Sequence, residues 1–166
     1  MTTTAHLPVV VIGAGPTGLA AAAHLVGRGL VPLVLEAGSA AGGAVREWAH
    51  VRLFSPWGEV LDPAAEKLLA PTGWTRPDPT AYPSGGDWAE QYLQPLADVL
   101  CDRVRLGTRV TGVSRAGRDR IVDADRELQP FVVHFTHADG REDRVTRAPR
   151  SPRRHRHGAT INAGGR

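Results

Sequence analysis

The chain has 166 residues, 42% of them hydrophobic, which is enough for one domain with a buried core. Its single cysteine, Cys101, excludes an internal disulfide, a CxxC redox pair and a cysteine-rich metal site. No apolar run approaches the ~20 residues of a membrane-spanning helix, and the N-terminus lacks the charged and apolar regions of a signal peptide. We therefore expect a cytoplasmic protein without membrane contacts.

The formal net charge of +3 comes from the end of the chain. Residues 148–166 contain five arginines and no acidic residue, whereas residues 1–147 hold 15 basic and 17 acidic residues, a net charge of −2. The main part of the chain therefore gives no electrostatic reason to expect nucleic-acid binding.

The first 36 residues predict a strand, a glycine turn, a helix and a second strand. An apolar run at 7–12 leads into GAGPTG at 13–18, and an alanine-rich helix follows that ends near Gly29. A β-branched run at 31–35 then closes with Glu36. Alternating strand and helix of this kind predict an α/β fold with a parallel sheet.

Each glycine of GAGPTG has its own physical task. Gly13 allows a tight turn, Gly15 allows backbone N–H groups to approach a pyrophosphate, and Gly18 allows the helix to pack on the strand. Phosphates are favoured at the helix N-terminus, and Glu36 can accept hydrogen bonds from an adenosine ribose that carries no 2′-phosphate. The pattern predicts a dinucleotide site; an ordinary strand, turn and helix without a ligand is the alternative.

Two features between residues 37 and 58 have open interpretations. Gly42-Gly43 is a second place where backbone passes close to a ligand, or else part of a flexible loop. The aromatic residues Trp48, Phe54 and Trp57 could wall a flat cofactor or belong to the core.

Two further helices have clear starting signals. Asp62-Pro63 predicts an N-cap followed by proline at the first helical position, and residues 71–86 form a connector that could lie over the ligand. Ser84 or Asp87 caps a helix that runs to about residue 99. Pro95 should kink or restart this helix, whose buried stripe is Trp88, Tyr92, Leu96 and Leu100.

The last elements are strands. Residues 104–113 alternate as one strand, and 131–135 pairs with 141–145 through a hairpin turn at Asp139-Gly140. His134 and His137 then point to opposite faces of their strand, so they are a poor metal pair and no metal site is expected.

Four features together resemble the flavoprotein oxidoreductases with two dinucleotide-binding domains, near the flavin-containing monooxygenase and thioredoxin-reductase-like branches. They are GAGPTG, Glu36, Gly42-Gly43 and the late strand VRLGTRVTGV. The resemblance covers about residues 7–145. It implies a truncated Rossmann-like FAD-binding domain over 1–147, with a parallel sheet, a small antiparallel β-meander, and NAD(P)H as electron donor of the full-length family.

The resemblance also implies which residues bind FAD. In these families the paired glycines pass near the flavin, and the residue after Thr-Arg in the late strand meets the adenine through its backbone. Family members commonly have arginine just before the paired glycines, where this chain has Ala40-Ala41. The implied FAD-binding residues are Gly13, Gly15, Pro16, Thr17, Gly18, Glu36, Gly43 and Val110.

By this resemblance the chain is part of an FAD-dependent oxidoreductase whose substrate and catalytic residues are unknown. The missing CxxC argues against the disulfide reductases and leaves monooxygenase-like or general reductase chemistry. A second GxGxxG is absent, so cofactor binding is expected and turnover by the short chain is left open. An NAD-binding Rossmann protein and a non-catalytic dinucleotide-binding remnant are the alternatives.

Residues 148–166 do not fit the family pattern. The family returns to the sheet here with an apolar strand, whereas this chain continues with an arginine-rich sequence. We predict that 148–166 is a basic, disordered tail produced by a frameshift near Pro149; a genuine basic arm for nucleic acid or anionic membrane is the alternative. The missing strand would leave an exposed sheet edge and low solubility.

Overall fold

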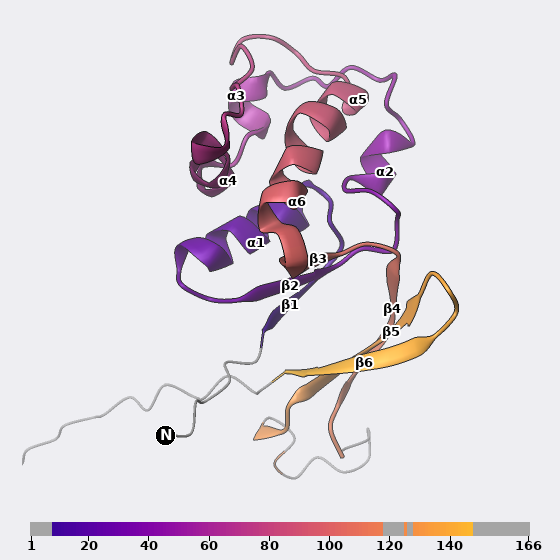
Figure 1. Ribbon diagram of the computed structural model, residues 1–166. Coiled ribbons are helices and arrows are strands. Elements are labelled where there is room, and N and C mark those ends of the chain that lie inside the picture. Colours follow the sequence, from indigo (N-terminus) through magenta and orange to yellow (C-terminus); the bar gives the residue numbers. More distant parts are fainter. Residues whose placement is uncertain (1–7, 118–124, 126–127, 148–166) are drawn as a thin grey trace, which may run out of the picture.

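The computed structural model describes residues 8–117, 125 and 128–147, which form two three-stranded sheets (Figure 1). One sheet is parallel, in the order β1-β2-β3, and the other is antiparallel, in the order β4-β5-β6. The predicted α/β class with a parallel sheet and a small β-meander is confirmed. The strands are β1 (Val9–Ile12), β2 (Pro32–Leu35), β3 (Val104–Arg105), β4 (Thr108–Arg115), β5 (Phe131–His137) and β6 (Glu142–Arg147).

The helices gather on one face of the parallel sheet and the meander lies on the other (Figure 1). Val34 of β2 belongs to the core beneath the helices, whereas Leu33 and Leu35 pack against the meander. The α-helices are α1 (Pro16–Gly27), α2 (Gly43–Arg46), α3 (Trp57–Val60), α4 (Pro63–Leu69), α5 (Gly85–Trp88) and α6 (Gln94–Leu100). Shorter turns are η1 (Ala70–Thr72), the π-helical η2 (Ala89–Leu93) and η3 (Cys101–Arg103).

Helix α1 ends at the predicted glycine. Gly29 has φ +70°, its N–H donates to the Val26 carbonyl at 2.9 Å, and the Leu30 N–H donates to the Leu25 carbonyl at 2.9 Å. These two bonds form a Schellman motif, which turns the chain from α1 back toward the sheet at β2.

Asp62 caps α4 as predicted and also ties it to its neighbours. Its Oδ1 accepts from the N–H groups of Ala64 at 2.8 Å and Ala65 at 3.1 Å, and its Oδ2 lies 3.0 Å from Nε2 of His24 in α1. Burial opposes ionisation of the Asp62 carboxyl, but the bonds from Ala65, His24 and Ala64 outweigh it and lower its pKa. The backbone N–H of Asp62 donates to the Tyr92 hydroxyl at 3.0 Å.

We expect Asp62→Ala to lower the free energy of unfolding by about 1–2 kcal/mol at neutral pH, because α4 loses its cap. A lowered carboxyl pKa stabilises the folded state above the unfolded-state pKa of about 4, and this contribution is lost as the pH falls through the lower folded-state pKa. The difference between wild type and variant should therefore shrink on acidification. Urea unfolding at several pH values measures it, with the exposed Glu47→Ala as control; a pH-independent difference would contradict the role of the carboxylate.

The helical segment after Ser84 begins with the expected cap. The Ser84 hydroxyl accepts from the Asp87 N–H at 3.1 Å, and the Asp87 carboxylate accepts from the Ser84 N–H at 2.9 Å, a capping box. The irregularity predicted at Pro95 takes the form of the π-helical turn η2, immediately before α6. Of the predicted stripe, Tyr92, Leu96 and Leu100 are buried and Trp88 is partly buried against the same core.

The prediction of a single strand at 104–113 is wrong. The chain pairs with β2 as β3, turns at Gly107, whose φ is +59°, and continues as β4 in the meander. Alternation of apolar and polar residues predicts a strand but does not say which strand it pairs with. The change from one sheet to the other therefore could not be predicted from the sequence. The hairpin from β5 to β6 through Asp139-Gly140 is confirmed.

The aromatic residues and the connector, whose interpretations were open, have defined places in the structure. Trp57 is buried and Trp48 packs against the same core, whereas Phe54 is fully exposed. The connector at 71–86 runs beside the segment before α4, where the Pro83 carbonyl accepts from the Leu53 N–H at 2.8 Å. Within the described ranges, no group of three or more potential ligands could hold a metal, and no helix is long and apolar enough to cross a membrane.

Among the described residues, the parallel sheet has an open edge at β1, as predicted. In this part of the chain β1 pairs with β2 alone, and Ile12 is 57% exposed. An apolar groove beside it is lined by Val10, Ile12, Val113, Phe131 and Val133. The low solubility expected from such an edge stays a prediction, and the tail at 148–166 lies outside the described residues.

Candidate functional site

Glycines form the first and last positions of the turn between β1 and α1. Gly13 has φ +95°, and its N–H donates to the Leu35 carbonyl at 2.8 Å. A Cβ on Gly18 would lie 2.0 Å from the Gly13 carbonyl oxygen, a backbone atom that no side-chain rotation can move away. Position 18 therefore has to be glycine for α1 to start so close to β1.

The first turn of α1 has the form of an anion-binding site. Gly15 is the N-cap residue, without a side-chain capping bond, and Pro16 is the first residue of the helix. A Cβ on Gly15 would meet no heavy atom within 4 Å. First-turn N–H groups, such as that of Thr17, have no acceptor within their helix, and the helix dipole favours negative charge beside them.

The carboxylate of Glu36 is fixed against this turn. Its Oε2 accepts from the Ala14 N–H at 2.6 Å, and its Oε1 accepts from the Gly38 N–H at 2.7 Å. Each carboxylate oxygen can accept a second hydrogen bond, so the group remains able to bind hydroxyls. The sequence indicated Glu36 but not its two partners, because backbone N–H donors have no signature in the side-chain pattern.

The paired glycines pack against both the turn and the acid. Gly42 has φ +69°, and its N–H donates to the Ala14 carbonyl at 2.9 Å. A Cβ on Gly43, the first residue of α2, would lie 3.8 Å from Oε1 of Glu36. The segment predicted to pass close to a ligand thus lies next to the residues predicted to bind its phosphates and ribose.

The segment from β3 to β4 flanks Glu36 on another side. The Glu36 carbonyl accepts from the Thr108 N–H at 2.7 Å, and the Gly38 carbonyl accepts from the Gly107 N–H at 2.8 Å. Val110 lies two residues further along β4, where its side chain packs with the cluster between sheet and meander. Its backbone contact with adenine stays a prediction.

Seven of the eight predicted site residues therefore gather where β1 and β2 end, which is where parallel sheets bind ligands. We call these seven residues the glycine-turn corner: Gly13, Gly15, Pro16, Thr17, Gly18, Glu36 and Gly43. Val110 belongs to the strand that passes this corner.

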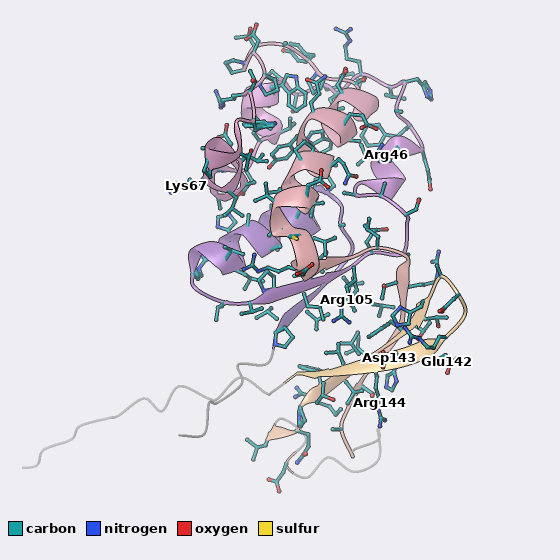
Figure 2. All side chains as sticks on the ribbon, in the orientation of Figure 1. Arg46, Lys67, Arg105, Glu142, Asp143 and Arg144 are labelled. Atoms are coloured by element: carbon teal, nitrogen blue, oxygen red, sulfur yellow. The ribbon has the colours of Figure 1, made fainter. Side chains whose placement is uncertain are left out.

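A separate hollow of about 440 Å³ lies on the meander. It is lined by Thr111, His134, Phe135, Glu142, Asp143 and Arg144, none of them a predicted site residue. Figure 2 places Glu142, Asp143 and Arg144 together on β6, away from α1. The glycine-turn corner is recognised instead by its backbone geometry.

The family of the chain follows from its sequence. A sequence model of the family described as pyridine nucleotide-disulphide oxidoreductase matches residues 10–130. The chain belongs to this family. The match begins within β1 and includes every residue of the glycine-turn corner.

Several solved structures are similar to this chain in fold. The bacillithiol disulfide reductase Bdr from Bacillus cereus matches with TM-score 0.63 and 24% identity over 86% of this chain and 37% of that chain. A flavin monooxygenase mutant from Stenotrophomonas maltophilia matches with TM-score 0.55 and 28% identity over 82% of this chain and 35% of that chain. OTEMO in complex with FAD and NADP matches with TM-score 0.57 and 25% identity over 85% of this chain and 24% of that chain. No curated protein matches the chain in sequence.

The predicted resemblance to flavoprotein oxidoreductases is confirmed. The prediction that this chain corresponds to only part of such proteins is confirmed as well. The chain spans 24–37% of the length of these three proteins. The family description refers to disulphide oxidoreductases, yet this chain contains Cys101 as its single cysteine and so has no dithiol of its own.

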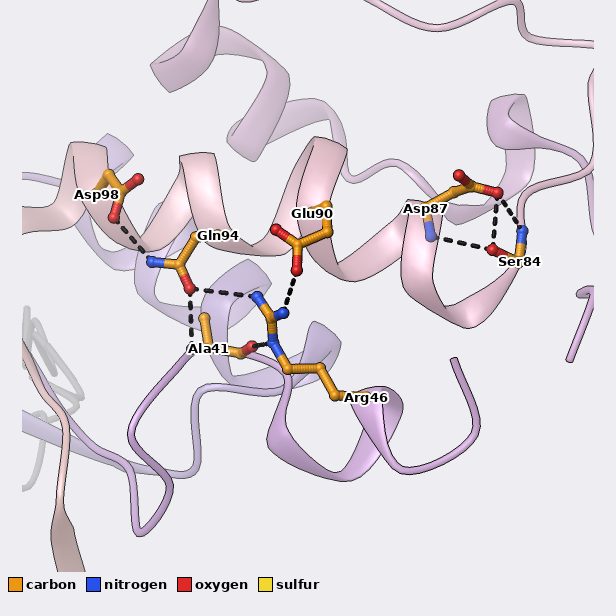
Figure 3. Close-up of polar contacts among 7 residues, drawn as sticks. All are labelled: Ala41, Arg46, Ser84, Asp87, Glu90, Gln94 and Asp98. Carbon is orange, nitrogen blue, oxygen red and sulfur yellow. Dashed lines mark hydrogen bonds and ion pairs between the residues drawn. The ribbon is translucent and has the colours of Figure 1, made fainter. Parts of the chain in front are cut away.

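One polar network beside the corner was not predicted (Figure 3). Arg46 of α2 donates through Nε to the Ala41 carbonyl at 2.9 Å and pairs with Glu90 of η2, while Gln94 of α6 accepts from the Ala41 N–H at 3.3 Å. Ala41 and Arg46 lie 44–53 positions before their partners Glu90 and Gln94, and no short motif links the two pairs. The sequence marked this segment in one way: Ala40-Ala41 stand before the paired glycines, where family members commonly have arginine.

Proposed function

We propose that this chain is the FAD-binding portion of an FAD-dependent oxidoreductase that is NAD(P)H-linked and monooxygenase-like. The observation that carries the proposal is the Glu36 carboxylate, held by the Ala14 N–H at 2.6 Å beside the uncapped first turn of α1. Anion-binding N–H groups next to a hydroxyl acceptor suit a pyrophosphate joined to an adenosine ribose. The similarity to a flavin monooxygenase supports the monooxygenase chemistry, and the similarity to OTEMO in complex with FAD and NADP supports the cofactors.

In this proposal the residues have distinct tasks. Gly15, Pro16 and Thr17 line the pyrophosphate position, and Gly13 and Gly18 shape the turn that supports it. Glu36 accepts from the ribose hydroxyls, Gly43 leaves room beside it, and the Val110 backbone meets the adenine. When bound, FAD accepts a hydride from NAD(P)H and passes the electrons to a substrate or to O₂.

The proposal also concerns the remainder of the enzyme and its location in the cell. Residues 1–147 form the cofactor-binding domain, and the nicotinamide nucleotide and substrate are held by parts of the enzyme that this chain does not supply, because it contains a single GxGxxG. A cytoplasmic location fits, since NAD(P)H is supplied there. The net charge of −2 over residues 1–147 argues against a nucleic-acid partner for this domain.

Absorbance and fluorescence of the purified chain test the proposal. We expect yellow protein, or a colourless apoprotein that quenches flavin fluorescence when titrated with FAD and binds NAD much more weakly. A protein that binds NAD and not FAD would replace the proposal by an NAD-binding role, and binding of neither would leave a non-catalytic remnant.

A further inference from the structure

The peptide backbone of Ala41 is held on both sides by side chains from neighbouring helices (Figure 3). Gln94 Oε1 accepts from the Ala41 N–H at 3.3 Å and from Arg46 Nη2 at 3.4 Å. Arg46 Nε donates to the Ala41 carbonyl at 2.9 Å. Gln94 and Arg46, which we call the Ala41 clamp, therefore fix the orientation of one buried residue.

The clamp is itself held in place. Nε2 of Gln94 donates to Oδ1 of Asp98 at 2.9 Å, which turns the amide oxygen toward Ala41 and Arg46. The guanidinium of Arg46 also pairs with the Glu90 carboxylate. Both members of the clamp are thus oriented by partners on η2 and α6, the segment that also builds the core.

Ala41 directly precedes the paired glycines, so the clamp determines where they lie. Gly42 donates to the Ala14 carbonyl of the glycine turn at 2.9 Å, and Gly43 lies beside the Glu36 carboxylate. A Cβ on Gly42 would lie 2.8 Å from Cδ1 of Leu93, so this turn also packs tightly against η2. A change at Gln94 is therefore transmitted to the corner through one residue of backbone.

We propose that Gln94 is a positioning residue for the FAD site, an inference that rests on the proposed function. It holds the turn at Gly42-Gly43 at the spacing from Ala14 and Glu36 that the cofactor requires. Gln94 acts through the backbone of Ala41, whose N–H it accepts from. Its loss frees the paired glycines to move and weakens FAD binding while the helical core stays folded.

Three variants of the full chain test this role. Gln94→Leu removes the acceptor and should raise the Kd for FAD about tenfold, the effect of losing two or so hydrogen bonds. Gln94→Glu keeps an acceptor oxygen for Ala41 and Arg46 but loses the bond to Asp98, so its Kd for FAD should lie between those of wild type and Gln94→Leu. Gln91→Leu is the matched control, because Gln91 is exposed on the same helical segment and its amide donates to Asp87 at 3.2 Å; its FAD affinity should be unchanged.

Amide hydrogen exchange at Ala41 separates positioning from general destabilisation. In apoprotein, exchange of this N–H should speed up in Gln94→Leu alone, with the thermal midpoint of Gln94→Leu close to that of Gln91→Leu. If Gln94→Leu fails to fold, Asp98→Ala, which frees the amide to rotate, should show a weaker loss of FAD affinity with faster Ala41 exchange. Unchanged Ala41 exchange and FAD affinity, or Gln94→Glu as weak as Gln94→Leu, would overturn the inference. If wild-type protein does not bind FAD, the proposed function is refuted instead. The exchange rate of the Ala41 N–H would still show whether Gln94 holds the Ala41 backbone in place.

Discussion

Gly18→Ala is expected to abolish FAD binding and to destabilise the chain by about 3 kcal/mol or more. The new Cβ would lie 2.0 Å from the Gly13 carbonyl oxygen, 3.1 Å from its carbon and 3.5 Å from Cγ1 of Val11. Two of these three atoms are backbone, so relief requires α1 to move away from β1. That movement would separate the first turn of α1 from the end of the strand and open the packing of Leu19 in the core.

Gly27→Ala is the matched control for this substitution. Gly27 is the last residue of the same helix, has an ordinary φ, and a Cβ there would meet no heavy atom within 4 Å. Alanine at this position should leave FAD affinity unchanged and stabilise the chain by up to about 1 kcal/mol, because it favours the helix. Urea unfolding and FAD titration of both variants measure the contrast. Equal stability and affinity in the two variants would show that α1 does not depend on close contact at position 18.

The parts of the fold that the sequence predicted correctly depend on local physical rules. Asp62, Ser84 and Gly29 mark helix ends because a cap involves bonds to backbone within a few residues. GAGPTG and Glu36 are recognisable because the turn needs small residues at fixed positions. These signals placed α1, α4, the helical segment after Ser84 and the first two strands, and they indicated seven residues that lie together where β1 and β2 end.

The parts that were not predicted depend on contacts between distant residues. The split between β3 and β4 is a choice of partner strand, and the turn at Gly107 that makes it possible could equally belong to a bulge. The Ala41 clamp joins α2 to α6, and the partners of Glu36 are backbone N–H groups. None of these produces a period or a fixed spacing, so each becomes visible only when the chain is folded.

Glu36→Ala is expected to weaken FAD binding about 100-fold, the largest loss of affinity from a change outside the glycine turn. The substitution removes a charged acceptor for the ribose hydroxyls, and hydrogen bonds to charged groups contribute about 1.5–3 kcal/mol each. It also leaves the N–H groups of Ala14 and Gly38 without the acceptor that now holds them at 2.6 and 2.7 Å. The glycine turn should therefore loosen in the apoprotein, which faster amide exchange at Ala14 would record.

The nucleotide preference of this variant tests the ribose assignment apart from any loosening of the turn. A carboxylate beside the ribose repels a 2′-phosphate, so wild type should bind 5′-AMP much more tightly than 2′,5′-ADP, which differs from it only by a 2′-phosphate, and the ratio of the two affinities should fall in Glu36→Ala. A looser turn alone would weaken both ligands equally and leave the ratio unchanged. Glu59→Ala, an exposed acid in the first turn of α3, should alter neither affinity nor ratio. An unaltered FAD affinity in Glu36→Ala would refute the assignment, and an equal loss for both nucleotides would reduce Glu36 to a support for the glycine turn.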